Sequence, residues 1–210
     1  MSSESSTTAT GQGLTRREMV ALMAMGAGTF LMPHPVRASE ATRIATRESR
    51  LAAAVGAAYT PKVYSAHEWA TVSMLVDYII PADAKSGSAT DAAVPEFMDT
   101  MLSLEPGMAP ANRGGLAWID HQCHQRFDKD FVDCTDPQRR QLLDDIAFPA
   151  RAPRELNAGV SWFNSFRDFT ATGFFTSELG VSDLGYEGNT AVPEWTGCPP
   201  ESYTRLGVVK

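Results

Sequence analysis

The chain has 210 residues, with 18 Lys and Arg against 25 Asp and Glu, and a net charge of −7 at pH 7. This acidic balance, with no run of basic residues after residue 38, argues against nucleic acid and anionic membrane surfaces as partners. Hydrophobic residues make up 43% of the chain, which is enough for one domain with its own core.

The first predicted element is an export signal over residues 1–38. Arg16 and Arg17 precede a short apolar run, and a VRA sequence ending at Ala38 has small residues at its first and third positions. An adjacent Arg pair before such a run is typical of the twin-arginine (Tat) route, with cleavage after Ala38. The run is shorter than the roughly 20 residues of a membrane-spanning helix, so we expect a soluble protein in the periplasm. An ordinary Sec signal and an uncleaved amphipathic anchor are the alternatives.

The Tat route exports folded proteins, and its usual cargo carries a cofactor that is inserted before export. The chain has no G-x-G-x-x-G, no P-loop, no C-x-x-C-H haem site and no C-x-x-C pair. The sequence therefore predicts no cofactor in this chain, and the reason for folded export lies outside it.

Residues 39–64 are predicted to be a linker or a short helix, and residues 65–177 a helical domain. Ser65 and Glu68 form a capping box, after which apolar residues recur at helical spacing until Pro81 ends the run. Four further helices are predicted to begin at Pro95, after the Gly114-Gly115 pair, at Asp136-Pro137 and near Arg154. The last of them extends to Thr172.

No segment alternates with period two for long enough to predict a strand. We therefore predict an all-α fold, a small irregular domain of about five helices with an extended, Gly- and Pro-rich C-terminal segment.

The C-terminal segment, residues 178–210, has neither helical nor strand periodicity. It keeps three aromatic residues, Tyr186, Trp195 and Tyr203, whereas a disordered tail is normally poor in them. A segment that binds a partner uses such rings as anchors. We predict a partner-binding tail, and the alternative is that these rings cover the helices of their own domain.

Three cysteines, Cys123, Cys134 and Cys198, allow at most one internal disulfide. Cys123 and Cys134 would close a short loop, whereas Cys198 reaches either of them only if the tail folds back. The sequence leaves the pairing open.

No catalytic, cofactor-binding or metal-binding set is predicted from the residues. His121 and His124 are spaced i, i+3 and both could face one metal ion, but a zinc or iron site needs three or more converging ligands. There is no G-x-S-x-G, and Asp144 and Asp145 point to different faces of a helix. A free-standing helical enzyme or metal protein that uses His121 and His124 is kept as an alternative function.

Two segments carry a resemblance to a known family. EWATVSMLVDYIIPADAKSGSATDAAVPEFMDTMLS, Glu68 to Ser103, and FRDFTATGFFTSELGVSDLGYEGN, Phe166 to Asn189, are similar to the opening and closing motifs of the gluconate 2-dehydrogenase subunit 3 family. The likeness runs from Glu68 to Asn189, which is most of the mature chain, and the Tat leader accompanies it. The middle of the chain, including His121, Cys123 and His124, matches no family feature.

The resemblance implies a small, non-catalytic subunit of a periplasmic sugar, sugar-acid or polyol dehydrogenase. Its partner would be an FAD-dependent flavoprotein of the glucose-methanol-choline type, often with a multihaem cytochrome c that associates with the membrane. That flavoprotein commonly lacks its own signal, so the small subunit would carry it through the Tat translocase and stay bound. This would explain a Tat leader on a chain without a cofactor motif. A periplasmic scaffold or ligand-binding module without a redox partner is a third class of function.

Overall fold

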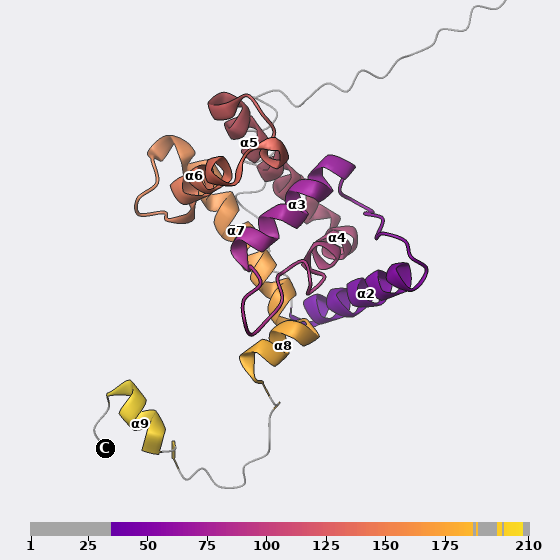
Figure 1. Ribbon diagram of the computed structural model, residues 1–210, viewed down its shortest axis with the longest axis vertical. Helices are drawn as coiled ribbons and strands as arrows, with labels where there is room; N and C mark the ends of the chain where they lie inside the picture. The colour runs from indigo at the N-terminus through magenta and orange to yellow at the C-terminus, as the bar shows by residue number, and fades with distance from the viewer. Residues whose placement is uncertain (1–34, 187, 189–196, 199, 208–210) are drawn as a thin grey trace, which may run out of the picture.

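Every regular element in the described part of the chain is helical. The computed structural model describes residues 35–186, 188, 197–198 and 200–207 (Figure 1). The α-helices are α2 (Pro35–Ala54), α3 (Ala66–Ile79), α4 (Val94–Leu104), α5 (Ala109–Phe127), α6 (Asp136–Ala147), α7 (Asn157–Phe175), α8 (Glu178–Leu184) and α9 (Pro200–Leu206). Short 3-10 helices are η1 (Pro106–Met108), η2 (Phe131–Asp133) and η3 (Arg154–Leu156). The predicted all-α class is confirmed.

Helix α7 is the central element, and it contacts α2, α3, α4, α5, α6 and α8 (Figure 1). Its aromatic face supplies much of the core, since Trp162, Phe163, Phe166 and Phe169 are all buried. Phe169 meets Phe97 of α4 edge to face, with 5.4 Å between the ring centroids. Burial of such rings is the main source of stability in a small helical domain.

The predicted N-terminal starts of α3, α4 and α6 are confirmed by capping residues and by prolines in the first turn. Ser65 accepts a hydrogen bond from the Glu68 amide at 3.3 Å, and the Glu68 carboxylate accepts one from the Ser65 amide at 2.8 Å, so the capping box is complete. Pro95 lies in the first turn of α4, and Pro137 lies in the first turn of α6. Proline has no amide hydrogen to lose at these positions, which is why it marks helix starts well.

Helix α5 begins earlier than predicted, at Ala109, so Gly114 and Gly115 lie inside it rather than before it. The reason is close packing against α7. A Cβ on Gly115 would lie 1.9 Å from Trp162 Nε1, and a Cβ on Gly159 of α7 would lie 2.1 Å from Trp118 of α5. Each helix thus places a tryptophan over a glycine of the other, and the glycine pair reflects packing rather than a helix boundary.

We expect Gly115→Ala to destabilise the domain by about 1–3 kcal/mol. The added methyl group would overlap Trp162, and the cost of this overlap exceeds the gain in helix propensity when alanine replaces glycine. Gly107→Ala is the matched control, since nothing lies within 4 Å of a Cβ there. Urea unfolding followed by circular dichroism measures both. Equal stability of the two variants would show that Trp162 moves aside without cost.

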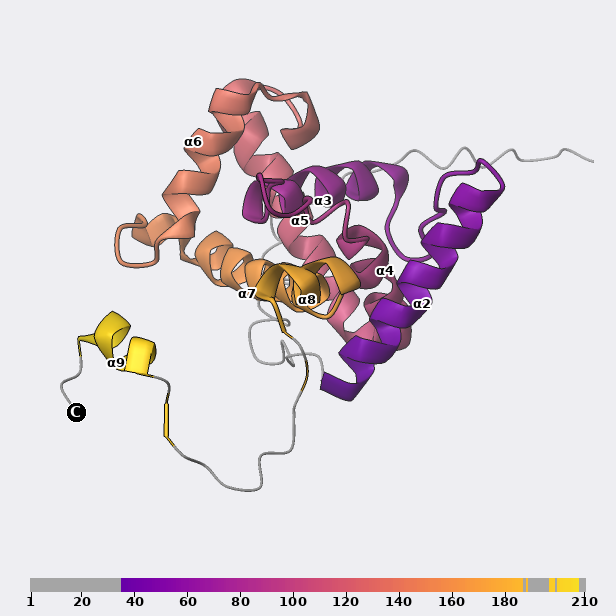
Figure 2. The same ribbon diagram turned by 60° about the horizontal axis from the view of Figure 1, so that its bottom comes forward.

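Residues 39–54 belong to α2, a helix of 20 residues that packs along α4 (Figure 2). Ala38, Ala41 and Ala45 are buried at helical spacing and form its contact face. The region predicted as a linker or short helix, residues 39–64, is therefore mostly part of this long helix.

The predicted cleavage after Ala38 falls in the first turn of α2, whereas the Tat motif itself lies outside the described residues. None of the helices in the described ranges is both long and apolar enough to span a bilayer.

The segment between α2 and α3 is held by one buried carboxylate. Asp99 of α4 has no exposed surface and accepts hydrogen bonds from the amides of Lys62 at 2.8 Å, Val63 at 2.9 Å and Tyr64 at 3.2 Å. The Tyr59 hydroxyl donates a fourth bond to it at 2.9 Å. Four donors compensate the buried charge and connect this segment to α4.

The helical domain continues through α8, beyond the boundary predicted at residue 177. The Ser177 hydroxyl caps α8 by accepting from the Gly180 amide at 3.1 Å, and Gly185, with a φ of 64°, ends the helix. Gly180 is buried against the backbone of Phe174. Ser at the N-cap and Gly after the last turn are ordinary helix signals, so α8 was readable from the sequence. The predicted extended segment also contains α9.

Candidate functional site

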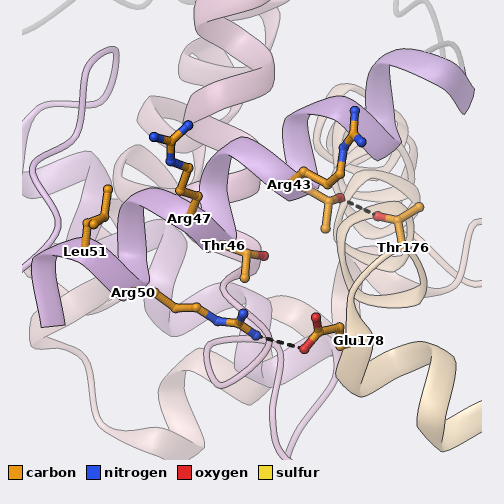
Figure 3. Close-up of a pocket in the computed structure, with 8 residues that line it drawn as sticks. Arg43, Thr46, Arg47, Arg50, Leu51, Thr176 and Glu178 are labelled. Carbon is orange, nitrogen blue, oxygen red and sulfur yellow. Dashed lines mark hydrogen bonds and ion pairs between the residues drawn. The ribbon is translucent and has the colours of Figure 1, made fainter. Parts of the chain in front are cut away.

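A pocket of about 410 Å³ lies between α2 and the junction of α7 with α8 (Figure 3). Its lining comes from residues far apart in the sequence: Thr42, Arg43, Thr46, Arg47, Arg50 and Leu51 of α2, with Thr176 and Glu178. The Thr42 and Thr176 hydroxyls lie 2.7 Å apart and join α2 to the end of α7. We call this pocket the arginine groove.

The charge of the arginine groove comes from the helical spacing of Arg43, Arg47 and Arg50. Spaced i, i+4 and i+7, they share one face of α2, away from the buried alanine face. Arg50 pairs with Glu178 at 2.8 Å, whereas neither Arg43 nor Arg47 makes a hydrogen bond or ion pair within the described ranges. The chain after residue 38 has no basic run in sequence, yet helical spacing places three arginines in the lining of one pocket.

Exposed apolar side chains lie on the elements that form this groove. Leu51 of α2 is 57% exposed, Phe175 at the end of α7 is 41% exposed, and Leu184 of α8 is 62% exposed. Exposed large apolar side chains on the same elements as unpaired cations are typical of a surface that a protein partner covers.

The three predicted tail anchors have different positions. Tyr186 follows α8 directly and is 56% exposed, which leaves its ring available for contact. Tyr203 lies in α9 and is partly buried. Trp195 lies outside the described residues. Their role in binding a partner stays a prediction.

A second group of polar side chains joins α3, α5 and the loop before η2. His67 Nε2 lies 2.7 Å from Asp120 Oδ2, and Asp120 Oδ1 accepts from the Phe131 amide at 2.9 Å. Asp130 Oδ1 lies 2.6 Å from His124 Nε2. One ligand atom from each of His67, Asp120 and Asp130 lies within 4.8 Å of the others. The hydrogen bond with Asp120 raises the pKa of His67, although burial opposes it.

His121 and His124 do not share a site in the structure. His124 pairs with Asp130, and His121 Nε2 is buried without a hydrogen-bond partner. Among the described residues, the group of potential metal ligands contains His67 in place of either of them. No sequence spacing pointed to it, because His67 and Asp120 are 53 residues apart.

All three cysteines are free thiols in the structure. Cys123 and Cys134 are buried, and Cys198 is exposed. Burial raises the pKa of the Cys123 thiol, with a further contribution from neighbouring Cys134. Cys123 therefore has neither the exposure nor the low pKa that a reactive cysteine needs, and Cys134 is too buried to react.

Comparison with known protein families gives a match. The family model described as gluconate 2-dehydrogenase subunit 3 matches residues 66–193. No curated protein and no solved structure matches the chain. The matched range starts with α3 and covers the His67, Asp120 and Asp130 group, whereas α2 and most of the arginine groove precede it.

Proposed function

Because the chain belongs to the gluconate 2-dehydrogenase subunit 3 family, we propose that it is the non-catalytic small subunit of an exported, FAD-dependent dehydrogenase complex. The catalytic subunit would be a flavoprotein of the glucose-methanol-choline type that oxidises a sugar, a sugar acid or a polyol. The family match over residues 66–193 carries this proposal, since a protein named as a subunit implies a catalytic partner.

The proposed role is maturation and export of that flavoprotein. FAD enters the catalytic subunit in the cytoplasm, where the small subunit binds it and supplies the signal with Arg16 and Arg17 for the Tat translocase. After export to the periplasm the two subunits stay together, and a multihaem cytochrome c accepts the electrons at the membrane. The Tat-type leader supports this role, because the chain itself carries no cofactor motif.

The arginine groove is the surface that we propose for docking the catalytic subunit. Arg43 and Arg47 are exposed cations without partners in the described part of the chain, so carboxylates on the flavoprotein would complement them. Leu51 in the groove would supply apolar contact area, and Leu184 and Tyr186, exposed at the end of α8 and just after it, would extend it. The groove also lies next to α8, where the predicted partner-binding tail continues the chain.

Charge reversal in the groove tests this function. We expect Arg43→Glu with Arg47→Glu to weaken co-purification with the flavoprotein at least tenfold, a loss of about 1.4 kcal/mol, since attraction becomes repulsion. The measurement is the FAD content and dehydrogenase activity recovered with the small subunit after co-expression.

Lys129→Glu with Arg154→Glu is the matched control, because both are exposed cations away from the groove. The control complex should form normally. Full recovery of the flavoprotein with the groove variant would place the interface elsewhere. Turnover or flavin binding by the isolated small subunit would contradict the non-catalytic role itself.

A further inference from the structure

We propose that His67, Asp120 and Asp130 form a binding site for one divalent transition-metal ion such as Zn²⁺, with His124 orienting Asp130. This site goes beyond the accessory function and does not depend on it. Imidazole nitrogen and carboxylate oxygen are ligands that Zn²⁺ accepts, and three protein ligands leave a fourth position for water or another group.

The spacing of the ligand atoms fits a tetrahedral ion. Zinc bonds of about 2.0–2.1 Å to nitrogen and oxygen put neighbouring ligand atoms about 3.3–3.4 Å apart. In the structure His67 Nε2 and Asp120 Oδ2 are 2.7 Å apart, and the whole group lies within 4.8 Å. The required spacing lies above the 2.7 Å of this pair and below the 4.8 Å limit for the group, so small side-chain rotations would accommodate the ion.

Two of the ligands are already oriented by hydrogen bonds. The Phe131 amide holds Asp120 Oδ1 at 2.9 Å, which directs Oδ2 toward His67. His124 contacts Asp130 Oδ1 at 2.6 Å and leaves Oδ2 available. Partners of this kind around a metal ligand orient it and raise affinity. The three ligands come from α3, α5 and the loop before η2, so an ion would connect these elements.

The local charge favours a cation. Two carboxylates face His67, and Asp128 and Asp133 lie close by in the sequence. Arg126 and Arg139 of the same region are engaged elsewhere, since Arg126 pairs with Asp145 at 2.6 Å and Arg139 donates to backbone carbonyls of the η2 segment, and Lys129 beside Asp130 is exposed to solvent. A metal ion would take the place of the proton that His67 shares with Asp120.

The test is a zinc titration of the mature chain after treatment with a chelator. A tag-free Cys198→Ser background removes the exposed thiol, which could bind zinc by itself. We expect one equivalent of Zn²⁺ by isothermal calorimetry. Co²⁺ in the same site should give the visible absorption of a tetrahedral complex.

Asp120→Asn and Asp130→Asn should each lower the affinity for Zn²⁺ at least tenfold, with circular dichroism confirming the fold. His121→Gln is the matched control, because His121 lies on the same helix as Asp120 but outside the site. Absence of stoichiometric binding would overturn the proposal. So would equal affinity of the aspartate variants and the parent, or an equal loss in His121→Gln.

Discussion

Replacing Arg16 and Arg17 together with Lys is expected to lower periplasmic dehydrogenase activity more than tenfold and to leave both subunits in the cytoplasm. Lysine keeps the positive charge but loses the planar set of guanidinium donors, so a receptor that reads the arginine pair no longer binds it. The flavoprotein has no other route in the proposed arrangement. Activity and FAD in periplasmic and cytoplasmic fractions measure the effect.

Arg43→Lys with Arg47→Lys is the matched control, because it makes the same chemical change in the arginine groove and retains the charge there. This control should be exported normally. Co-purification from the cytoplasm should still recover the complex of the signal variant, which separates failed export from failed assembly. Unchanged periplasmic activity in the Arg16 and Arg17 variant would refute the carrier role.

Helix boundaries were predictable where a local cap or a proline fixes them. The capping box of Ser65 and Glu68 depends on residues three apart, and Pro95 and Pro137 act only on their own turns. Such signals need no knowledge of the rest of the fold. The buried aromatic face of α7 was predictable for the same reason, since its period lies within one segment.

Boundaries that depend on packing were not predictable. Gly115 looks like a break in the sequence, but it lies inside α5 because Trp162 needs the space that a side chain would fill. Helix α2 is anchored by small alanines that give a weak hydrophobic pattern, and its burial depends on α4. Tertiary contacts override local preference at such positions.

The candidate sites required the folded chain. The arginine groove joins α2 to Thr176 and Glu178, which follow it by more than 120 residues. His67 approaches Asp120 only because α3 packs against α5 and η2. The sequence drew attention to His121 and His124 through their spacing, but spacing within one helix says nothing about ligands on another.

Asp99→Ala is expected to destabilise the domain by about 3–5 kcal/mol, because several donors lose their acceptor at once and each unsatisfied buried donor costs about 1–3 kcal/mol. The amides of Lys62, Val63 and Tyr64 and the hydroxyl of Tyr59 would lose their common acceptor. Buried donors without an acceptor each carry a desolvation cost. The segment joining α2 to α3 would lose its four hydrogen bonds to α4.

Thermal unfolding by circular dichroism measures this effect, and a loss of this size lowers Tm by roughly 6–20 °C in a domain of this length. Asp168→Ala is the control, because this exposed carboxylate has only a 3.8 Å ion pair with Arg167 and its loss should cost less than about 1 kcal/mol. Asp99→Asn should fall between the two, since its amide keeps one acceptor oxygen but carries no charge. If Asp99→Ala were as stable as Asp168→Ala, the segment of residues 59–64 would be held by the packing of Tyr64 and its 2.8 Å bond to Asn112 instead of by the carboxylate.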